Sequence, residues 1–252
     1  MTSSKRYAVV SCHVERPLDD RVWARFAALQ EARPGGFAIA ALIRPPDPEA
    51  GEDAGLWLAR AREAAEHGPL GHHTHWTAPD HARPSGDGIP ADRVRGEAAW
   101  LREQGLTPTL FCGGGWYSDL AVAEACAELG YVDCTATAYR PGYLPADAPR
   151  LGLAGPAWVA LQSGSRLLEL PSTHSLGMLA REVLMPSGLR SELVHLHFHD
   201  TDLVDTRRRL TLVWALRALA RRLQPGNLDV VAGLVRDAAA EVAFEEIVAP
   251  AT

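Results

Sequence analysis

Short apolar runs alternate with longer segments of helical periodicity along most of the chain. Residues 7–12 predict a first strand, and the segment after it predicts a helix that begins near Asp19 and Asp20, since carboxylates favour a helix N-terminus. Further strands are expected at residues 37–43, 69–75, 109–112, 131–137, 158–161, 167–170 and 192–199, and further helices at residues 54–66, 91–104, 118–129, 206–223 and 228–244. Residues 80–90 and 141–156 are rich in proline and glycine and predict long loops.

The alternation of strands and helices predicts an α/β fold. It indicates a parallel sheet with helices packed outside it. Six or seven such units in one chain favour a closed or nearly closed barrel over an open sheet, which is the alternative. A barrel of this kind carries its reactive side chains on the loops that follow the carboxyl ends of its strands.

The composition fits a globular α/β protein and argues against nucleic acid as a partner. The 252 residues are 47% hydrophobic, which is enough to bury the core of one large domain or two small ones. The net charge is −6, whereas phosphate binding needs a basic face. We interpret the arginines at 207–209 and 221–222 as the polar face of one long helix.

Neither a membrane anchor nor a disulfide framework is expected. No segment approaches the roughly 20 apolar residues that a membrane helix needs, and residues 7–12 are too short for the apolar part of a signal peptide. We therefore expect a cytoplasmic protein that does not bind membranes. Cys12, Cys112, Cys126 and Cys134 lack the spacing of a zinc knuckle or a redox pair, and most are interpreted as small core residues. The oligomeric state is left open.

Seven of the ten histidines lie in three clusters at the ends of predicted strands, where a barrel would carry its chemistry. The clusters are His13 and Glu15 followed by Asp19 and Asp20; His72, His73 and His75; and His195, His197 and His199 followed by Asp200.

The third cluster lies on a strand, where successive side chains point to opposite faces. The apolar side chains between its histidines are predicted to face the helices, and the histidines themselves to face the barrel interior. Buried imidazoles need hydrogen bonds or a bound ion. We interpret His195, which is deepest along the strand, as structural, and His199, at the strand end, as functional.

The second cluster indicates a metal site. His73 and His75 are two residues apart, so on an extended segment they project from the same side. Two imidazoles and a carboxylate, with open positions for water, form the usual site of a divalent ion that activates water. The acids after the first strand are candidate third ligands, and zinc is the expected ion. His72 faces the opposite way and is interpreted as structural.

A glycine-rich segment, residues 113–115, joins a predicted strand to a predicted helix. Its glycines allow the backbone to approach a ligand, although the lysine and the spacing of a phosphate-binding loop are missing. Side chains near this segment and near the clusters fit either the apolar face of a sugar ring or the core. These candidates for substrate contact are Trp76, Gly114, Trp116, Tyr117, His174 and His197.

The motifs, in this order, resemble those of the polysaccharide deacetylase superfamily, the NodB-homology or carbohydrate esterase family 4 group. The resemblance covers roughly residues 7–210. It implies a NodB-like distorted (β/α)7 barrel, a single catalytic domain over residues 1–252, and removal of N- or O-acetyl groups from amino sugars and related compounds. It also implies a metal held by one acid and two histidines, an aspartate as general base and a histidine as general acid.

Carried over by position, the resemblance implies four functional residues. In His13-Val14-Glu15 the metal ligand is Glu15, and in His73-Thr74-His75-Trp76 the ligands are His73 and His75. The motif Phe198-His199-Asp200 implies His199 as general acid.

Two positions depart from the family pattern. His13 stands where the family has its basic aspartate, so that His13 and Asp20 are both candidates for the general base. Cys112 stands where the family commonly has an arginine that orients the charges of the site.

The expected function is metal-dependent hydrolysis of an acyl group from a small, acylated, sugar-like molecule. One alternative is a binding or regulatory module that keeps the barrel and has lost hydrolysis, which the departures at His13 and Cys112 favour. Another is a metal-dependent hydrolase of a non-sugar amide. A phosphoester substrate is disfavoured because few basic residues lie near the clusters in the sequence.

Overall fold

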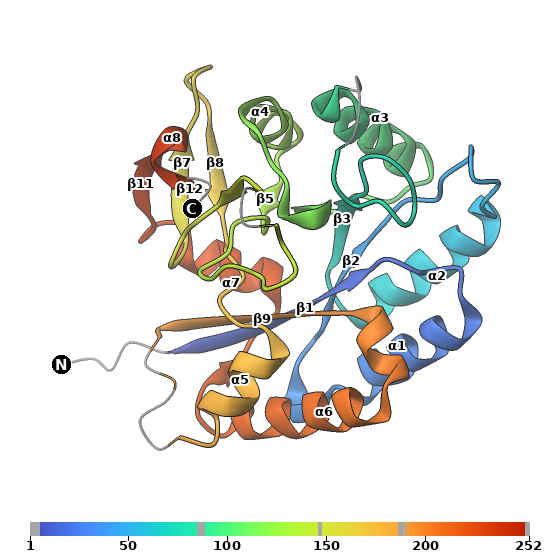
Figure 1. Ribbon diagram of the computed structural model, residues 1–252, viewed down its shortest axis with the longest axis vertical. Helices are drawn as coiled ribbons and strands as arrows, with labels where there is room; N and C mark the ends of the chain where they lie inside the picture. The colour runs from blue at the N-terminus through green and yellow to red at the C-terminus, as the bar shows by residue number, and fades with distance from the viewer. Residues whose placement is uncertain (1–5, 85–88, 146–147, 186–188, 190, 250–252) are drawn as a thin grey trace.

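The computed structural model describes residues 6–84, 89–145, 148–185, 189 and 191–249, and at its centre a mostly parallel sheet curls into a barrel (Figure 1). Among these residues the ring consists of seven parallel strands: β1 (Tyr7–Val14), β2 (Ala40–Ile43), β3 (Leu70–Thr74), β4 (Leu110–Gly113), β5 (Val132–Asp133), β8 (Arg166–Glu169) and β9 (Leu193–His199). The ring closes where the chain after β8 runs beside β9, with His197 N donating to His174 O at 3.2 Å. The predicted distorted (β/α)7 barrel of the NodB-like type is confirmed.

Shorter strands extend this ring. β7 (Ala157–Ala160) pairs antiparallel with β8, β11 (Ala240–Ala243) pairs with β7, and β10 (Gln224–Pro225) pairs with β1. A separate pair is formed by β6 (Arg150–Leu151) and β12 (Val248–Ala249). The strand expected at residues 158–161 therefore exists, but it lies outside the ring.

Helices surround the strands, as Figure 1 shows. They are α1 (Asp20–Ala32), α2 (Ala54–His67), α3 (Pro90–Glu103), α4 (Leu120–Leu129), α5 (Leu176–Glu182), α6 (Thr206–Ala220), α7 (Leu228–Val235) and α8 (Phe244–Ile247). The side chain of Asp19 accepts hydrogen bonds from the N–H groups of Arg21 and Val22, which confirms the predicted start of α1. Gly130, with φ of 76°, ends α4 in the left-handed conformation.

The C-terminal part of the chain corrects one prediction. The helix expected over residues 228–244 ends at Val235, and residues 240–243 form β11 instead. This segment pairs with β7 and completes the edge of the sheet, so tertiary pairing overrides the helical pattern. Helix α5 and the pair β6–β12 were not expected, and residues 85–88 and 146–147 of the two expected loops lie outside the described residues.

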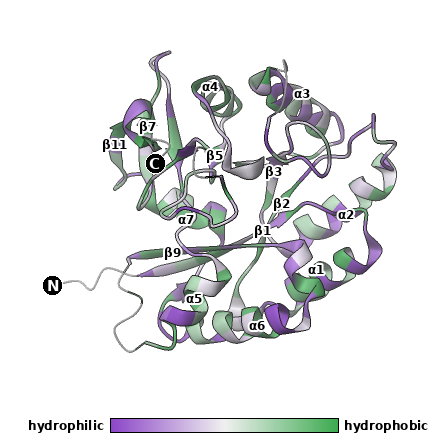
Figure 2. Ribbon diagram, in the orientation of Figure 1, coloured by the Kyte–Doolittle hydropathy of each residue, from purple (hydrophilic) through white to green (hydrophobic). Residues whose placement is uncertain are grey.

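The strands have an apolar face toward the helices and a mixed face toward the barrel interior. Val194, Leu196 and Phe198 of β9 pack in a core cluster with residues of α1, α2 and α6, as the period-two pattern predicts. Leu193 faces the interior, where α7 supplies Leu228 and closes the end at which the strands begin. Figure 2 shows apolar residues along β2 and both kinds of residue along α6. No helix in the described part of the chain is long and apolar enough to cross a membrane.

Candidate metal centre and catalytic site

Four side chains meet at the carboxyl end of the barrel. Glu15 follows β1, His73 lies on β3 with His75 just after it, and His199 ends β9. Glu15 Oε1 lies 3.6 Å from His75 Nε2, 3.6 Å from His199 Nε2 and 4.0 Å from His73 Nε2. Such separations suit donors around one ion at metal–ligand distances of about 2.0–2.2 Å.

Main-chain oxygens orient the two histidines of β3. His73 Nδ1 donates to the carbonyl of Cys112 at 2.8 Å, and His75 Nδ1 donates to the carbonyl of Pro79 at 2.7 Å. Each ring therefore presents the lone pair of Nε2, and both Nε2 atoms are buried without a hydrogen-bond partner among the described residues. Buried polar atoms are rarely left without a partner, and a histidine that donates its other N–H to a carbonyl is typical of metal sites. The donor set fits a divalent ion.

The charges of these groups also fit a cation. Burial by itself would raise the pKa of Glu15, but the neighbouring imidazoles of His75, His199 and His73 outweigh it and lower the pKa to about 2. Burial and the neighbouring His75 lower the pKa of His73 to about 3. At neutral pH the anionic carboxylate of Glu15 thus faces the neutral imidazole of His73.

His13 lies deeper in the barrel, behind this group. Its ring centroid is 4.8 Å from that of His73 and 5.1 Å from that of His199, and burial followed by these imidazoles lowers its pKa well below the ordinary value. Its Nε2 lies 3.6 Å from Sγ of Cys112. His13, His73 and Cys112 form a second group whose donor atoms lie within 4.8 Å of one another.

Two expected carboxylates lie elsewhere. Asp20 forms an ion pair with Arg60 of α2, and its side chain is 90% exposed, so it is not part of the cluster. Asp200 is buried, and its oxygens accept hydrogen bonds from the backbone N–H of Arg16 at 2.8 Å and of Thr201 at 2.8 Å. The carboxylate beside His199 is that of Asp202, whose Oδ2 accepts from the backbone N–H of His199 at 3.1 Å and lies 4.0 Å from Nδ1.

His195 and His72, which are interpreted as structural from the sequence, both have hydrogen-bond partners within the protein. His195 donates from Nδ1 to Leu170 O at 3.2 Å, and its Nε2 lies 2.9 Å from the hydroxyl of Ser11. Burial lowers its pKa to about 4. His72 points outward, with Nε2 2.8 Å from a carboxylate oxygen of Glu97 on α3.

Three of the expected substrate contacts have other partners. The indole N–H of buried Trp76 donates to Gly114 O at 3.0 Å. A Cβ on Gly114 would come within 2.5 Å of Thr74 O and 3.1 Å of the His75 ring. Glycine is therefore needed here so that the backbone can pack against His75. His174 points to Glu182 of α5, with 3.0 Å between Nε2 and Oε2.

The first N–H group of the glycine turn is already bonded within the protein. Gly113 N donates to the hydroxyl of Thr135 at 2.7 Å, so it is not available to a ligand. Tyr117 is partly buried and donates its hydroxyl to Asp119 at 2.8 Å. Gly115 and Trp116 both have positive φ, 59° and 58°, a conformation that is unfavourable for tryptophan and that turns its ring into the site.

Aromatic rings form the wall next to the histidines. Trp116 is 2% exposed, with its ring 5.0 Å from His13 and 4.6 Å from His197. His197 Nδ1 lies 3.0 Å from the hydroxyl of Tyr139. Tyr143, which is 62% exposed, accepts a hydrogen bond from the indole of Trp116, and its ring lies 6.4 Å from that of His199. Tyr143 comes from the loop expected at residues 141–156 and Tyr139 from just before it, and neither was among the candidates.

Two cavities open beside the cluster. One, of about 500 Å³, is bordered by Glu15 and His75. The other, of about 490 Å³, is bordered by His199 and by Arg207 and Arg208 of α6. The expectation that basic residues are distant from the clusters is therefore wrong, since these arginines, which also lie on the polar face of α6, come to the site through the fold.

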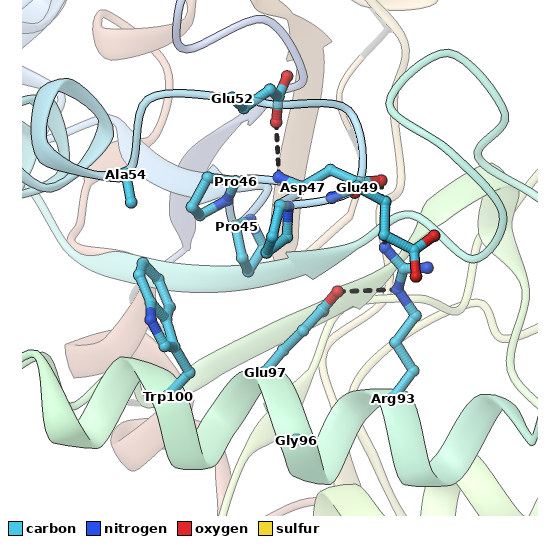
Figure 3. A pocket seen from close by; sticks show the side chains of 11 residues that line it. Pro45, Pro46, Asp47, Glu49, Glu52, Ala54, Arg93, Gly96, Glu97 and Trp100 are labelled. Atoms are coloured by element: carbon cyan, nitrogen blue, oxygen red, sulfur yellow. Dashed lines mark hydrogen bonds and ion pairs between the residues drawn. The ribbon is translucent and has the colours of Figure 1, made fainter.

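A third cavity, of about 580 Å³, lies apart from the cluster, between the loop after β2 and α3 (Figure 3). Two of its carboxylates are paired with arginines: Glu52 binds Arg44 at 2.7 Å, and Glu97 binds Arg93 at 2.9 Å. Pro45, Pro46 and Trp100 form its apolar wall (Figure 3). No histidine, cysteine or hydroxyl side chain is among the described residues that border it, so the histidine cluster is the stronger candidate for the chemistry.

Comparison with known proteins supports this assignment of the fold. No protein-family model and no sequence of a curated protein matches the chain. The structure is similar to that of a candidate polysaccharide deacetylase from Mycobacterium smegmatis, with a TM-score of 0.62, 14% identity, and coverage of 94% of this chain and 93% of that chain. It is also similar to 4-alpha-glucanotransferase from Thermococcus litoralis, with a TM-score of 0.57, 13% identity, and coverage of 94% of this chain and 40% of that chain. At these identities the likeness is one of fold.

Proposed function

We propose that this chain is a divergent member of the polysaccharide deacetylase superfamily, a metal-dependent hydrolase that removes an acetyl group from an amino-sugar-like small molecule. The observation that carries the proposal is the pair of buried Nε2 atoms of His73 and His75, which face Glu15 and have no hydrogen-bond partner among the described residues. The similarity in fold to a candidate polysaccharide deacetylase supports the same reaction.

Glu15, His73 and His75 would hold the ion. Zinc suits a carboxylate and two imidazoles in a site with open positions. When bound, the ion would supply Lewis-acid chemistry, polarising an acyl carbonyl and making water more acidic.

The acid and base roles fall to two histidines. His199 borders a cavity large enough for a leaving group, with its side chain 22% exposed, so it can donate a proton to the departing amine. His13 is neutral at neutral pH because burial lowers its pKa, and it is the remaining candidate for accepting the proton of the attacking water, since Asp20 faces Arg60. Tyr143, exposed beside His199, suits the apolar face of a sugar ring.

The test measures metal content and acetate release on the same preparations. Purified protein incubated with zinc and then desalted is expected to hold about one ion per chain, and to release acetate from soluble N-acetylated amino sugars. His73→Gln is expected to lose both properties, whereas His67→Gln, at the end of α2, is expected to keep both. A wild-type protein that binds no ion contradicts the proposal. A protein that binds the ion but releases no acetate from any such sugar would favour the alternative of a binding module.

A further inference from the structure

We infer that the cavity beside His199 receives the leaving part of the substrate, and that Arg207 and Arg208 bind a phosphoryl group on that part. The inference rests on the proposed function, because it takes His199 as the proton donor to the leaving group. It narrows the substrate class from acetylated amino sugars in general to those that carry a phosphate or phosphodiester.

The cavity lies on the side of the cluster where His199 is. Its volume of about 490 Å³ is within the range of small-molecule sites. His199 and His197 border it from β9, Tyr143 borders it from the loop after β5, and Arg207 and Arg208 border it from α6. Glu15 and His75 border the other opening, so His199 is the member of the cluster that faces the arginines.

The wall of the cavity carries more positive than negative charge. The chain has a net charge of −6, yet this wall has two guanidinium groups and one carboxylate, that of Asp202. Arg208 pairs with Asp202, so the one carboxylate of the wall is already neutralised by one of the two arginines. Arg207 is exposed and makes no ion pair within 4 Å and no side-chain hydrogen bond with any residue of the described ranges, although its charge acts on Asp205 at the start of the helix. Its N–H groups therefore remain available to an anion.

The arginines lie at the end of helix α6 where positive side chains are unfavourable. Residues 207–209 lie in the first turn of α6, where the helix dipole favours anions and disfavours cations. Three arginines there oppose the dipole, although Asp205 caps the helix by accepting from Arg208 N at 2.9 Å. Arg208 pairs with Asp202 and Arg209 donates to Leu203 O at 2.7 Å, so Arg207 is the arginine of this turn that a bound anion would offset together with the helix dipole.

The donor set distinguishes a phosphoryl group from a carboxylate. Guanidinium groups bind phosphate in a two-pronged geometry, and the hydroxyls of Ser175 and Thr211 also border the cavity. The donors come from several sides of the cavity, which suits the three terminal oxygens and the higher negative charge of a phosphate monoester better than the planar, singly charged carboxylate.

The experiment compares two probes that differ by the phosphoryl group. Binding of N-acetylglucosamine 1-phosphate and of neutral methyl N-acetylglucosaminide to the zinc-loaded full chain is measured by titration calorimetry. We expect the phosphorylated probe to bind at least about tenfold more tightly, and this preference to weaken as salt is added. Arg207→Gln should remove most of the preference while changing the affinity for the neutral probe less than about twofold. Arg217→Gln, later on the same helix, should change neither affinity.

The outcomes separate this inference from the proposed function. Equal affinity of the wild-type protein for the two probes overturns the inference, whether or not acetate is released. A preference for phosphate that Arg207→Gln leaves intact also overturns it. If the protein releases no acetate but prefers the phosphorylated probe, and Arg207→Gln loses this preference, the phosphoryl site is supported and the proposed hydrolase activity is contradicted.

Discussion

Sγ of Cys112 lies 3.6 Å from Nε2 of His13, deep in the barrel. These are the two positions that depart from the deacetylase pattern, in which an aspartate and an arginine would stand. A buried carboxylate and guanidinium stabilise each other, whereas either one alone is an uncompensated charge. Here both groups are neutral, because burial lowers the pKa of His13 and raises the pKa of the Cys112 thiol. Under the proposed function, the two departures together replace a charged pair with a neutral pair.

This pairing predicts strong coupling in a double-mutant cycle. His13→Asp and Cys112→Arg each introduce one buried charge and should each destabilise the protein by about 3–5 kcal/mol. The double variant should be more stable than the sum of the two effects by at least about 1 kcal/mol. Urea denaturation of the three variants and the wild type gives these free energies of unfolding. Additive effects would mean that the two positions are independent.

His199→Ala should separate proton donation from metal binding. Loss of a general acid lowers turnover by about 10²- to 10⁴-fold, while Glu15, His73 and His75 remain to hold the ion. The measurements are acetate release under saturating substrate and zinc content by mass spectrometry. If zinc is lost along with turnover, His199 is a fourth ligand, which its 3.6 Å separation from Glu15 Oε1 would permit. Unchanged turnover would remove His199 from the mechanism.

Asp20→Asn should leave both turnover and metal content at wild-type values. Its carboxylate is 90% exposed and paired with Arg60, and an exposed ion pair contributes about 0–1 kcal/mol to stability. Glu15→Gln is the matched comparison, because it keeps the size of the side chain and removes the negative charge that faces the three imidazoles. It should lose the ion. A tenfold fall in turnover for Asp20→Asn would restore Asp20 as a candidate base.

A buried pair of acids predicts a specific pH dependence of stability. Asp133 on β5 and Glu169 on β8 are register partners, and both are fully buried. Each has one oxygen that lacks a donor among the described residues, so a proton held between the two would satisfy both. Burial raises the pKa of both carboxyls, and the charge of Asp133 raises the pKa of Glu169 further.

Since the folded pair holds its proton more tightly than the unfolded chain, its contribution to stability is present below the ordinary carboxyl pKa of about 4. That contribution is lost as the pH rises through the raised pKa values. Glu169→Gln keeps the hydrogen bond and removes the titration, so the stability of this variant relative to wild type should increase between pH 5 and pH 8. Glu103→Gln, at the exposed end of α3, should show no such change. Urea unfolding at both pH values tests this, and an equal difference at the two would contradict it.

The parts of the site that depend on local chain geometry could be predicted from the sequence. Side chains alternate along a strand, which placed His199 on the interior face of β9 and paired His73 with His75 on one side of β3. The barrel rule, by which chemistry follows the strands, then predicted that these residues and Glu15 would meet. Hydrogen bonds to the interior also fit the structural interpretation of His195.

The rest depends on contacts between segments far apart in the sequence. Arg207 reads as a solvated helix residue until α6 is placed beside the end of β9, and Tyr143 lies in a proline-rich loop with no periodic pattern. Asp20 and His174 are residue types that often take part in catalysis. In the structure, however, Asp20 pairs with Arg60 and His174 with Glu182. Both partners lie on helices, and the sequence does not show which way these helices face. β11 is strand only because β7 offers it an edge.

The main-chain hydrogen bonds to His73 and His75 have a consequence for how this sequence can evolve. A carbonyl oxygen is present whatever residue occupies positions 112 and 79, so the aim of both rings survives substitution of Cys112 or Pro79. Substitution at these positions therefore leaves the aim of the rings unchanged, whereas an insertion or deletion in either segment would shift the acceptor and misdirect the ring. If the proposed function holds, this explains how a cysteine could stand in place of the family arginine beside His73 without changing the aim of that ring.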